Sequence, residues 1–237
     1  MFTHYFKVAI RNLFAHKTQT LVSLFGLAIA FACVSLAAYW NYYERTYDAF
    51  QENANRIYRI RTKDFYKVTG EPMANTPYPL HVYLKEQYPE VEEACAIARI
   101  MNHKVSMNGM TYPQDIVPLQ VTSGVLDVFD FEWLEGNKNV MAYQGHQIAI
   151  SDELAKGLCK DGSPLGKIME NLYTKVKYEV VGVYKTRPKH SNVKFDIIMP
   201  LYKTIYSTWY TYSCHTYVLL KEKVNHAHFI QKLQKDT

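Results

Sequence analysis

The run LVSLFGLAIAFACVSLAAYW, residues 21–40, carries no charged side chain over its whole length. A helix rises about 1.5 Å per residue, so the run spans about 30 Å, the thickness of a bilayer hydrocarbon core. A cleaved secretory signal peptide is the alternative, but the run is longer than the apolar part of such a peptide and no clear Ala-x-Ala cleavage site follows it. The sequence therefore predicts one uncleaved transmembrane helix.

The charges on the two sides of this run predict its orientation. Lys7, Arg11 and Lys17 precede it without any acidic residue, whereas a mixed and slightly acidic stretch follows at 44–52. Because basic flanks stay in the cytoplasm, we expect a cytoplasmic N-terminus and an extracytoplasmic C-terminal part. Residues 1–20 place apolar side chains on one helical face, which predicts a short amphipathic helix. Its three basic residues could contact the inner membrane surface or a cytoplasmic partner, or be only a basic flank.

The composition of the chain is that of a folded protein. Its 237 residues are 48% hydrophobic and 21% charged, which is enough to bury a core. The net charge of +5 is mild, and Lys and Arg are scattered along the chain, so no nucleic-acid partner is expected. The cysteines show no paired spacing, which argues against a complete disulfide framework but leaves one bridge open. They are Cys33, Cys95, Cys159 and Cys214.

Residues 41–237 mix strand-like and helix-like segments without a strict alternation of the two. Runs rich in Val, Ile and Tyr predict strands, and apolar residues at helical spacing predict helices. Ser151, followed by two acidic residues, is a good helix start. The expected fold class is therefore α+β, a mixed sheet with helices, preceded by the transmembrane helix and the amphipathic helix. The expected strands are 56–62, 93–101, 104–109, 110–121, 146–151, 177–185, 193–201 and 214–222, and the expected helices are 43–55, 76–89, 151–159 and 225–234.

Motifs for ATP binding and hydrolysis are not indicated. GSPLGK, residues 162–167, has one residue too few between its first Gly and the Gly-Lys pair, and Ile168 follows where a phosphate loop needs Ser or Thr. We expect a turn between a helix and a strand there. His190 and Ser191 are adjacent, but adjacency in sequence is not catalytic geometry, and neither GxSxG nor HExxH occurs. The sequence predicts no catalytic residue.

Four residues near the C-terminus could offer metal ligands: Cys214, His215, His226 and His228. In a strand, however, Cys214 and His215 point to opposite faces. On a helix, His226 and His228 do not share a face. We therefore expect no metal site and no cofactor-binding site.

The polar link KTRPKHSNVK, residues 185–194, lies between two apolar runs. Pro188 and Asn192 supply turn chemistry, so a solvated connection between two strands is the expectation. A contact with an extracytoplasmic partner is the alternative role for its basic side chains, namely Arg187, Lys189 and His190.

Five stretches together resemble the N-terminal part of ABC transporter permeases of the MacB/FtsX type. They include FKVAIRNLFAHKTQTLVSLFGLAIAFA, YERTYDAFQENANRIYRI and YEVVGVYKTRPKHSNVKFDIIMPL, and they occupy residues 6–32, 43–60, 121–137, 148–169 and 178–201. The region after the apolar run resembles the MacB-like periplasmic core domain of these permeases. The resemblance implies a cytoplasmic segment at 1–20, a transmembrane helix at 21–40 and a periplasmic α+β core domain at 41–237.

The resemblance also implies a function and partners. Such permeases lie in the bacterial inner membrane and have a periplasmic domain that relays ATP-driven motion to envelope proteins or exported substrates. ATP is expected only on a separate cytoplasmic ATPase subunit, so the chain itself is expected to be non-catalytic. The implied partners are the lipid bilayer, that ATPase subunit, a second permease copy and a periplasmic protein or substrate.

The sequence departs from the family in one respect, because no second apolar run is long enough to span a membrane. We therefore expect either a fragment or truncated copy of a permease, or a single-pass protein that keeps the periplasmic module, and we do not expect transport by this chain alone. A single-pass sensor or ligand-binding module without an ATPase is the main alternative, and an anchored metalloenzyme is a third.

Overall fold

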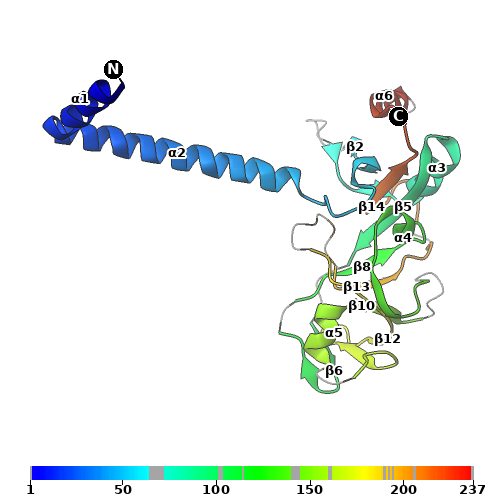
Figure 1. Ribbon diagram of the computed structural model, residues 1–237. Coiled ribbons are helices and arrows are strands. Elements are labelled where there is room, and N and C mark those ends of the chain that lie inside the picture. The colour runs from blue at the N-terminus through cyan, green and yellow to red at the C-terminus, as the bar shows by residue number, and fades with distance from the viewer. Residues whose placement is uncertain are drawn as a thin grey trace. The chain divides into compact units, whose positions relative to one another are not determined.

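The structure is a computed structural model that describes residues 2–63, 72–100, 104–113, 115–139, 145–159, 162–188, 191, 193, 195–204 and 207–235. It divides into two compact units, Met1–Ala49 and Phe50–Thr237. The first unit consists of two helices, and the second is built around a sheet (Figure 1). We describe each unit separately.

The first unit contains α1 (Phe2–Ala15) and α2 (Lys17–Arg45). Within the described residues, α2 is the one helix long and apolar enough to cross a membrane, by its length and composition. None of its residues is buried against protein, so its apolar side chains lie open on all sides. The predicted apolar helix is confirmed and extends beyond residues 21–40 at both ends.

The predicted helix over 43–55 is wrong. Helix α2 ends at Arg45, and the chain continues in turns until the short 3-10 helix η1 (Ala54–Arg56). The Thr46 hydroxyl donates toward the main-chain oxygens of Tyr42 and Tyr43, at 3.1 and 3.0 Å. Asp48 then adopts a φ of +56°, in the left-handed region where a right-handed helix cannot continue.

Among the described residues, the second unit has one large sheet of twelve strands and a separate pair, β2 (Thr62–Lys63) and β3 (Pro72–Met73). The main order is β1-β14-β5-β8-β13-β10-β12-β11-β6-β7, with β4 beside β14 and β9 beside β12. Two pairs, β8–β13 and β10–β12, are parallel and the others are antiparallel. The strands are β1 (Ile57–Arg59), β4 (Thr76–Pro77), β5 (Val91–Arg99), β6 (Val105–Met107), β7 (Met110–Thr111), β8 (Pro118–Val121), β9 (Trp133–Gly136), β10 (Gln147–Ser151), β11 (Ile168–Asn171), β12 (Lys177–Tyr184), β13 (Ile197–Pro200) and β14 (Tyr212–Leu220).

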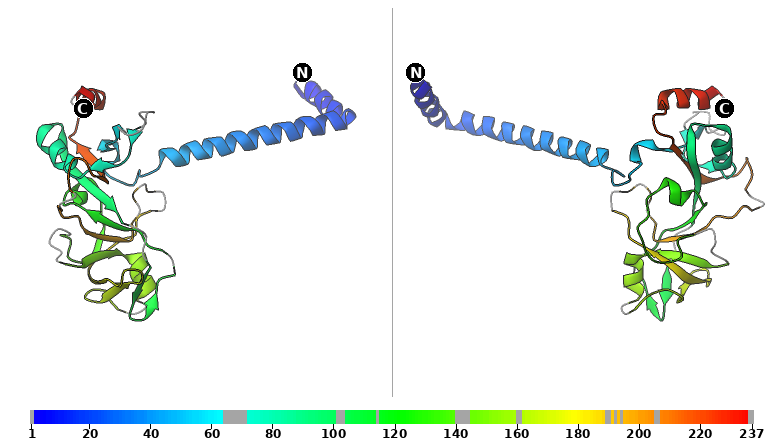
Figure 2. Two further views of the ribbon diagram at one scale, coloured as in Figure 1. Left: turned by 180° about the vertical axis from the view of Figure 1, so that it is seen from behind. Right: turned by 45° about the vertical axis from the view of Figure 1, so that its right-hand side comes forward.

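The helices of this unit are α3 (Leu80–Gln87), α4 (Val125–Val128), α5 (Asp152–Leu158) and α6 (His226–Lys235). Figures 1 and 2 show α3 and α6 near the β5–β14 end of the sheet and α5 near the β6–β12 end. Leu84 of α3 and Phe229 of α6 pack in one cluster with residues of β5 and β14. Mixed sheet pairing with helices at both ends confirms the predicted α+β class.

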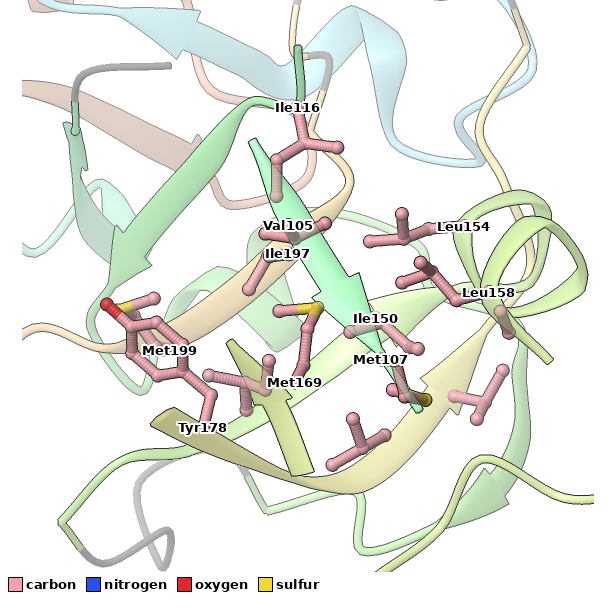
Figure 3. Packing of buried hydrophobic residues seen from close by; sticks show 14 residues of the cluster. Val105, Met107, Ile116, Ile150, Leu154, Leu158, Met169, Tyr178, Ile197 and Met199 are labelled. Carbon is pink, nitrogen blue, oxygen red and sulfur yellow. The ribbon is translucent and has the colours of Figure 1, made fainter. Parts of the chain in front are cut away.

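The central strands bury both of their faces, which explains their nearly continuous apolar runs. Along β10, Ile148 and Ile150 enter one core cluster while Ala149 enters another. Along β13, Ile197 enters the same cluster as Ile148 and Ile150, and Ile198 enters the same cluster as Ala149. Figure 3 shows the first of these clusters, in which Ile150 and Ile197 meet Leu154 and other residues of α5, β6, β11 and β12.

Strand β9 approaches β12 unusually closely. Gly136 of β9 lies opposite Gly182 of β12 and has a φ of +82°. A Cβ added at Gly136 would meet the Val181 carbonyl oxygen and the Gly182 Cα. Glycine is therefore required here both for its backbone conformation and for the space it leaves.

Several local predictions are confirmed. The Ser151 hydroxyl accepts a hydrogen bond from the Leu154 amide at 3.3 Å and caps α5. Asn225 caps α6 through bonds from the Ala227 and His228 amides. Residues 162–167 form the expected turn, which here leads into β11.

Candidate functional site

The first candidate site is the basic N-terminal helix. Lys7 and Arg11 lie four residues apart in α1, and Lys17 opens α2; all three side chains are exposed. The Thr20 hydroxyl donates to the Leu13 carbonyl oxygen at 3.0 Å and so links the two helices across the break at His16. The geometry leaves the three cations free to meet an anionic surface, but whether they contact lipid or protein stays a prediction.

The second candidate site is the link after β12. It connects β12 to β13, as the sequence predicts, but these strands are not neighbours, because β10 lies between them. Lys189 and His190 lie outside the described residues. Ser191 is buried, and its hydroxyl donates to the Val193 carbonyl oxygen at 3.3 Å. The proposed contact through Lys189 and His190 therefore stays a prediction.

The predicted solvated link would expose the charged group of Arg187, but in the structure this group is not exposed to solvent. Its three guanidinium nitrogens are buried, and its Cζ lies near four phenylalanine rings. The distances from Cζ to the ring centroids are 5.2 Å for Phe50, 5.4 Å for Phe129, 5.5 Å for Phe131 and 5.6 Å for Phe195. A guanidinium at this distance from ring faces is attracted by their quadrupoles, most strongly when water is excluded. We call Arg187 and these four rings the Arg187 corner.

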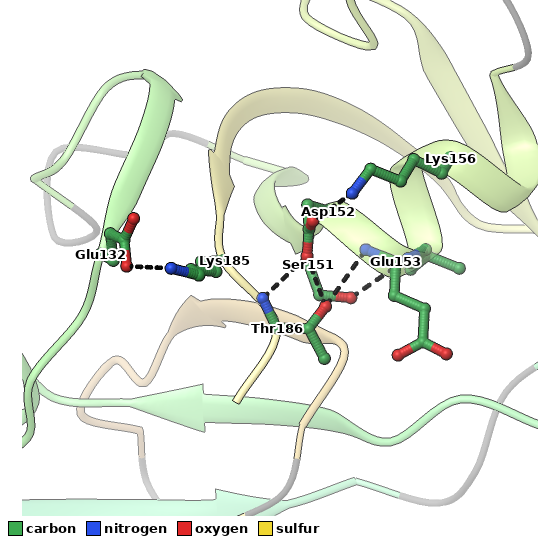
Figure 4. Close-up of polar contacts among 8 residues, drawn as sticks. Glu132, Ser151, Asp152, Glu153, Lys156, Lys185 and Thr186 are labelled. Atoms are coloured by element: carbon green, nitrogen blue, oxygen red, sulfur yellow. Dashed lines mark hydrogen bonds and ion pairs between the residues drawn. The ribbon is translucent and has the colours of Figure 1, made fainter. Parts of the chain in front are cut away.

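Polar contacts join Thr186, the residue before Arg187, to the start of α5 (Figure 4). The Asp152 carboxylate accepts bonds from the Thr186 amide at 2.8 Å and from the Thr186 hydroxyl at 2.6 Å, and it pairs with Lys156. Burial by itself raises the pKa of Asp152, but the bonds from Lys156 and Thr186 outweigh it and lower the pKa to about 2. Lys185 forms a surface ion pair with Glu132 at 2.7 Å. These contacts fix the first residues of the link.

The same corner holds the segment that enters the second unit. The Gln51 side-chain oxygen accepts a bond from the Asp130 amide at 2.9 Å, and the Glu52 amide donates to the Asp130 carboxylate at 2.6 Å. Gln51 is 5% exposed, which is unusual for this residue type. The sequence reasoning missed Phe50, Gln51 and Asp130, because no local motif joins positions 50 and 130.

The residues considered as metal ligands have other environments. Cys214 is buried in β14, and burial raises the pKa of its thiol. The side chain of His215 lies on the less buried face of the strand. Its partial burial is the main cause that lowers its pKa, and the positive charges of Arg59 and Arg99 lower the pKa further. Within the described part of the chain, no group of three or more His, Cys, Asp and Glu side chains could hold a metal ion.

One exposed aromatic group was not singled out from the sequence. Tyr83 of α3 and Trp209 meet edge to face with their ring centroids 5.8 Å apart. Trp209 is 48% exposed and the adjacent Tyr210 is 90% exposed. The signal in the sequence is a run without Lys, Arg, Asp or Glu at 204–220 that places these rings in a loop.

The structure thus consists of a long apolar helix, which is a candidate membrane span, followed by a mixed α+β unit. The chain matches the model of the MacB-like periplasmic core domain over residues 20–236. It therefore belongs to this family, whose core domain is found in permeases of ABC-type transporters. No curated protein sequence matches the chain.

Three solved structures have a similar fold. A domain of a protein described as a permease from Porphyromonas gingivalis has a TM-score of 0.67 at 21% identity, covering 78% of this chain and 84% of that one. The periplasmic region of MacB from Actinobacillus actinomycetemcomitans has a TM-score of 0.56 at 14% identity, covering 77% and 82%. The extracellular domain of the noncanonic ABC-type transporter YknZ from Gram-positive bacteria has a TM-score of 0.52 at 22% identity, covering 70% and 84%.

Proposed function

We propose that the chain forms the N-terminal membrane helix and periplasmic domain of an ABC transporter permease in the bacterial inner membrane. In this role it is non-catalytic and binds no cofactor, because ATP is hydrolysed by a separate cytoplasmic ATPase subunit. Its periplasmic domain relays the resulting motion to envelope proteins or exported substrates. A second permease copy completes the assembly.

The observation that carries this proposal is the extent of the family match. The match begins at residue 20, so it includes most of α2 as well as the sheet of the second unit. The sheet adds support, because its first strand β1 pairs antiparallel with its last strand β14, with Ile57 opposite Leu219. The chain thus enters and leaves the described sheet through two neighbouring strands at one end of the strand order.

The basic residues of the first unit support a cytoplasmic N-terminus. Lys7, Arg11 and Lys17 stand before the apolar run 21–40 without an acidic residue, and such flanks remain on the cytoplasmic side. In this orientation the three cations reach the inner-leaflet headgroups, where each contributes about 1 kcal/mol of attraction to anionic lipid. Trp40, Tyr42 and Tyr43 then lie at the outer interface, which favours aromatic side chains.

Cysteine labelling in intact cells tests the orientation. In a background with Cys33→Ser and Cys159→Ser, the variants Asn12→Cys and Tyr210→Cys place one thiol on each side of the membrane. Both positions are exposed. We expect a small charged maleimide to label Tyr210→Cys in intact cells and Asn12→Cys only after lysis. The opposite pattern would overturn the proposed topology.

Association with an ATPase tests the function itself. The tagged chain is purified from mild-detergent membrane extracts of cells that express it together with its neighbouring genes. We expect an ABC ATPase subunit to copurify, and we expect the yield of that subunit to fall when Lys7, Arg11 and Lys17 are all replaced by Gln if α1 contacts it. Repeated purification without any ATPase would instead favour the single-pass sensor or ligand-binding module.

A further inference from the structure

The segment that enters the second unit is fastened at two separate points. The first point is the Arg187 corner, where the Phe50 ring meets the Arg187 guanidinium and residues 51–52 exchange two hydrogen bonds with Asp130. The two bonds run in opposite directions, since one uses the Asp130 amide as donor and the other uses its carboxylate as acceptor. Such a reciprocal pair fixes both the position and the orientation of residues 51–52.

The second point is Arg56. Its Nη1 donates to the Glu92 carboxylate at 2.6 Å and to the Leu220 carbonyl oxygen at 2.9 Å, and its Nε and Nη2 bond to Asn53 Oδ1. Directly after it, β1 joins the sheet beside β14. This point belongs to the sheet and holds the chain whether or not the first point forms.

The first point therefore has a role that the sheet does not require. Without it, residues 50–52 would be a tether of three residues between Asn53, which Arg56 holds, and the turns at 46–49, with a reach of about 10 Å when fully extended. With it, the fixed part of the unit begins at residue 50, beside Asp130, which precedes β9, and Arg187 of the β12–β13 link. A displacement is then delivered to the middle of the sheet rather than only to its β1 edge.

We propose that Phe50, Gln51 and Glu52, held by Asp130 and Arg187, form a latch that makes the start of the second unit rigid and so lets movement of α2 reach the sheet. Asp130 and Arg187 act as positioning residues in this latch. The inference rests on the proposed relay function, and it specifies where the relay enters the domain.

Arg187 suits this position because it combines charge with a flat shape. Phe129 and Phe195 are almost fully buried, whereas Phe50 is 37% exposed, so Arg187 lies between the core and the incoming segment. A cation attracts the exposed ring without needing a directional bond. A Met of similar length would fill the space but would lose this attraction, whereas a Lys would retain part of it.

Amide hydrogen exchange on the full chain in lipid nanodiscs tests the latch. The informative amides are Glu52, which bonds to Asp130, and Ile60, which bonds to the Thr216 carbonyl oxygen and reports on the sheet edge. In Asp130→Ala we expect exchange at Glu52 to rise about tenfold or more, as for loss of a hydrogen bond to a charged group, while Ile60 is unchanged. Arg187→Met should produce the same local increase, and Arg187→Lys and Asp130→Asn should restore part of the protection.

Asp127→Ala is the matched control, because Asp127 is an exposed acid three residues away in α4. Exchange at Glu52 should remain at the wild-type value in this variant. The latch is overturned if Glu52 already exchanges as an open amide in the wild type, or if Glu52 and Ile60 rise together, which would indicate general destabilisation. No ATPase is present in this experiment, so its outcome is independent of the copurification test of the proposed function.

Discussion

The two units use the same residue types in opposite ways. Leu36 and Phe25 of α2 are 68% and 67% exposed, whereas Ile150 of β10 and Val180 of β12 are fully buried. The first unit has no protein surface to cover its apolar side chains, and the second covers them with its own sheet and helices. The difference shows that apolar content alone does not define a core: the second unit buries its apolar side chains within itself, whereas those of α2 are exposed and suit a lipid environment.

A buried charge in the sheet should break this comparison most strongly. Val180 lies in the cluster formed with α5, so Val180→Asp would place an unpaired carboxylate among apolar side chains. We expect the free energy of unfolding of the second unit to fall by about 3–5 kcal/mol, while α2 still inserts into membranes. Denaturant unfolding followed by near-ultraviolet circular dichroism measures the loss.

The control for this substitution lies on the same strand. Lys177→Asp introduces the same side chain at an exposed position of β12 and should change the unfolding free energy by less than about 0.5 kcal/mol. Equal stability of the two variants would contradict the assignment of Val180 to the core.

A charge in α2 should have the complementary effect. Ala30 lies near the middle of the apolar run, so Ala30→Arg should raise the free energy of membrane insertion by about 2.5–3.5 kcal/mol. The second unit should keep its unfolding free energy, because α2 contributes no buried residue to it. The fraction of chain recovered in membranes measures the cost.

The control for the depth of the charge in the membrane is an Arg side chain at the end of the helix. Gln19→Arg lies in the first turn of α2, close to Lys17, where a basic residue can reach the headgroups. Its recovery in membranes should match that of the wild type. If Ala30→Arg were recovered equally well, α2 would not be a membrane helix.

The comparison also shows which features could be predicted from sequence. The apolar run of α2 and the Ser151 cap of α5 depend on residues close together in the chain, and both are confirmed. The Arg187 corner could not be predicted, because Phe50, Phe129 and Phe195 come from separate segments that meet only in the folded unit.

Two local features of the fold have physical causes that the sequence pattern does not show. The helix expected over 43–55 ends early because Thr46 bonds back to main-chain oxygens and Asp48 turns the chain. Along β12, Val181 is only partly buried and lies between the buried residues Val180 and Gly182. The pairing with β10 shifts at this point, from Ile148 opposite Val180 to Ala149 opposite Gly182, and a bulge of this kind leaves no mark in the alternation of apolar residues.

The starts of α2 and α5 extend the comparison to polar groups. Helix α2 begins at Lys17, and its N-cap residue His16 makes no side-chain cap bond. Helix α5 has only seven residues and depends on Ser151, Asp152 and their bonds to the β12–β13 link. Acid should therefore weaken the second unit at α5 while leaving α2 intact.

The pKa of Asp152 sets the pH range of this smallest effect. Its pKa falls from 3.8 to about 2 on folding, so its stabilisation is fully present above about pH 4 and is lost as the pH falls toward 2. Asp152→Asn should be about 1 kcal/mol less stable than the wild type at pH 7, and the difference should shrink over that range because the wild-type carboxylate becomes protonated. Glu153 is the exposed neighbour in the same turn, and Glu153→Gln should show a smaller difference from the wild type. If the stability difference between Asp152→Asn and the wild type stayed constant from pH 7 to pH 2, the charge of Asp152 would not stabilise α5.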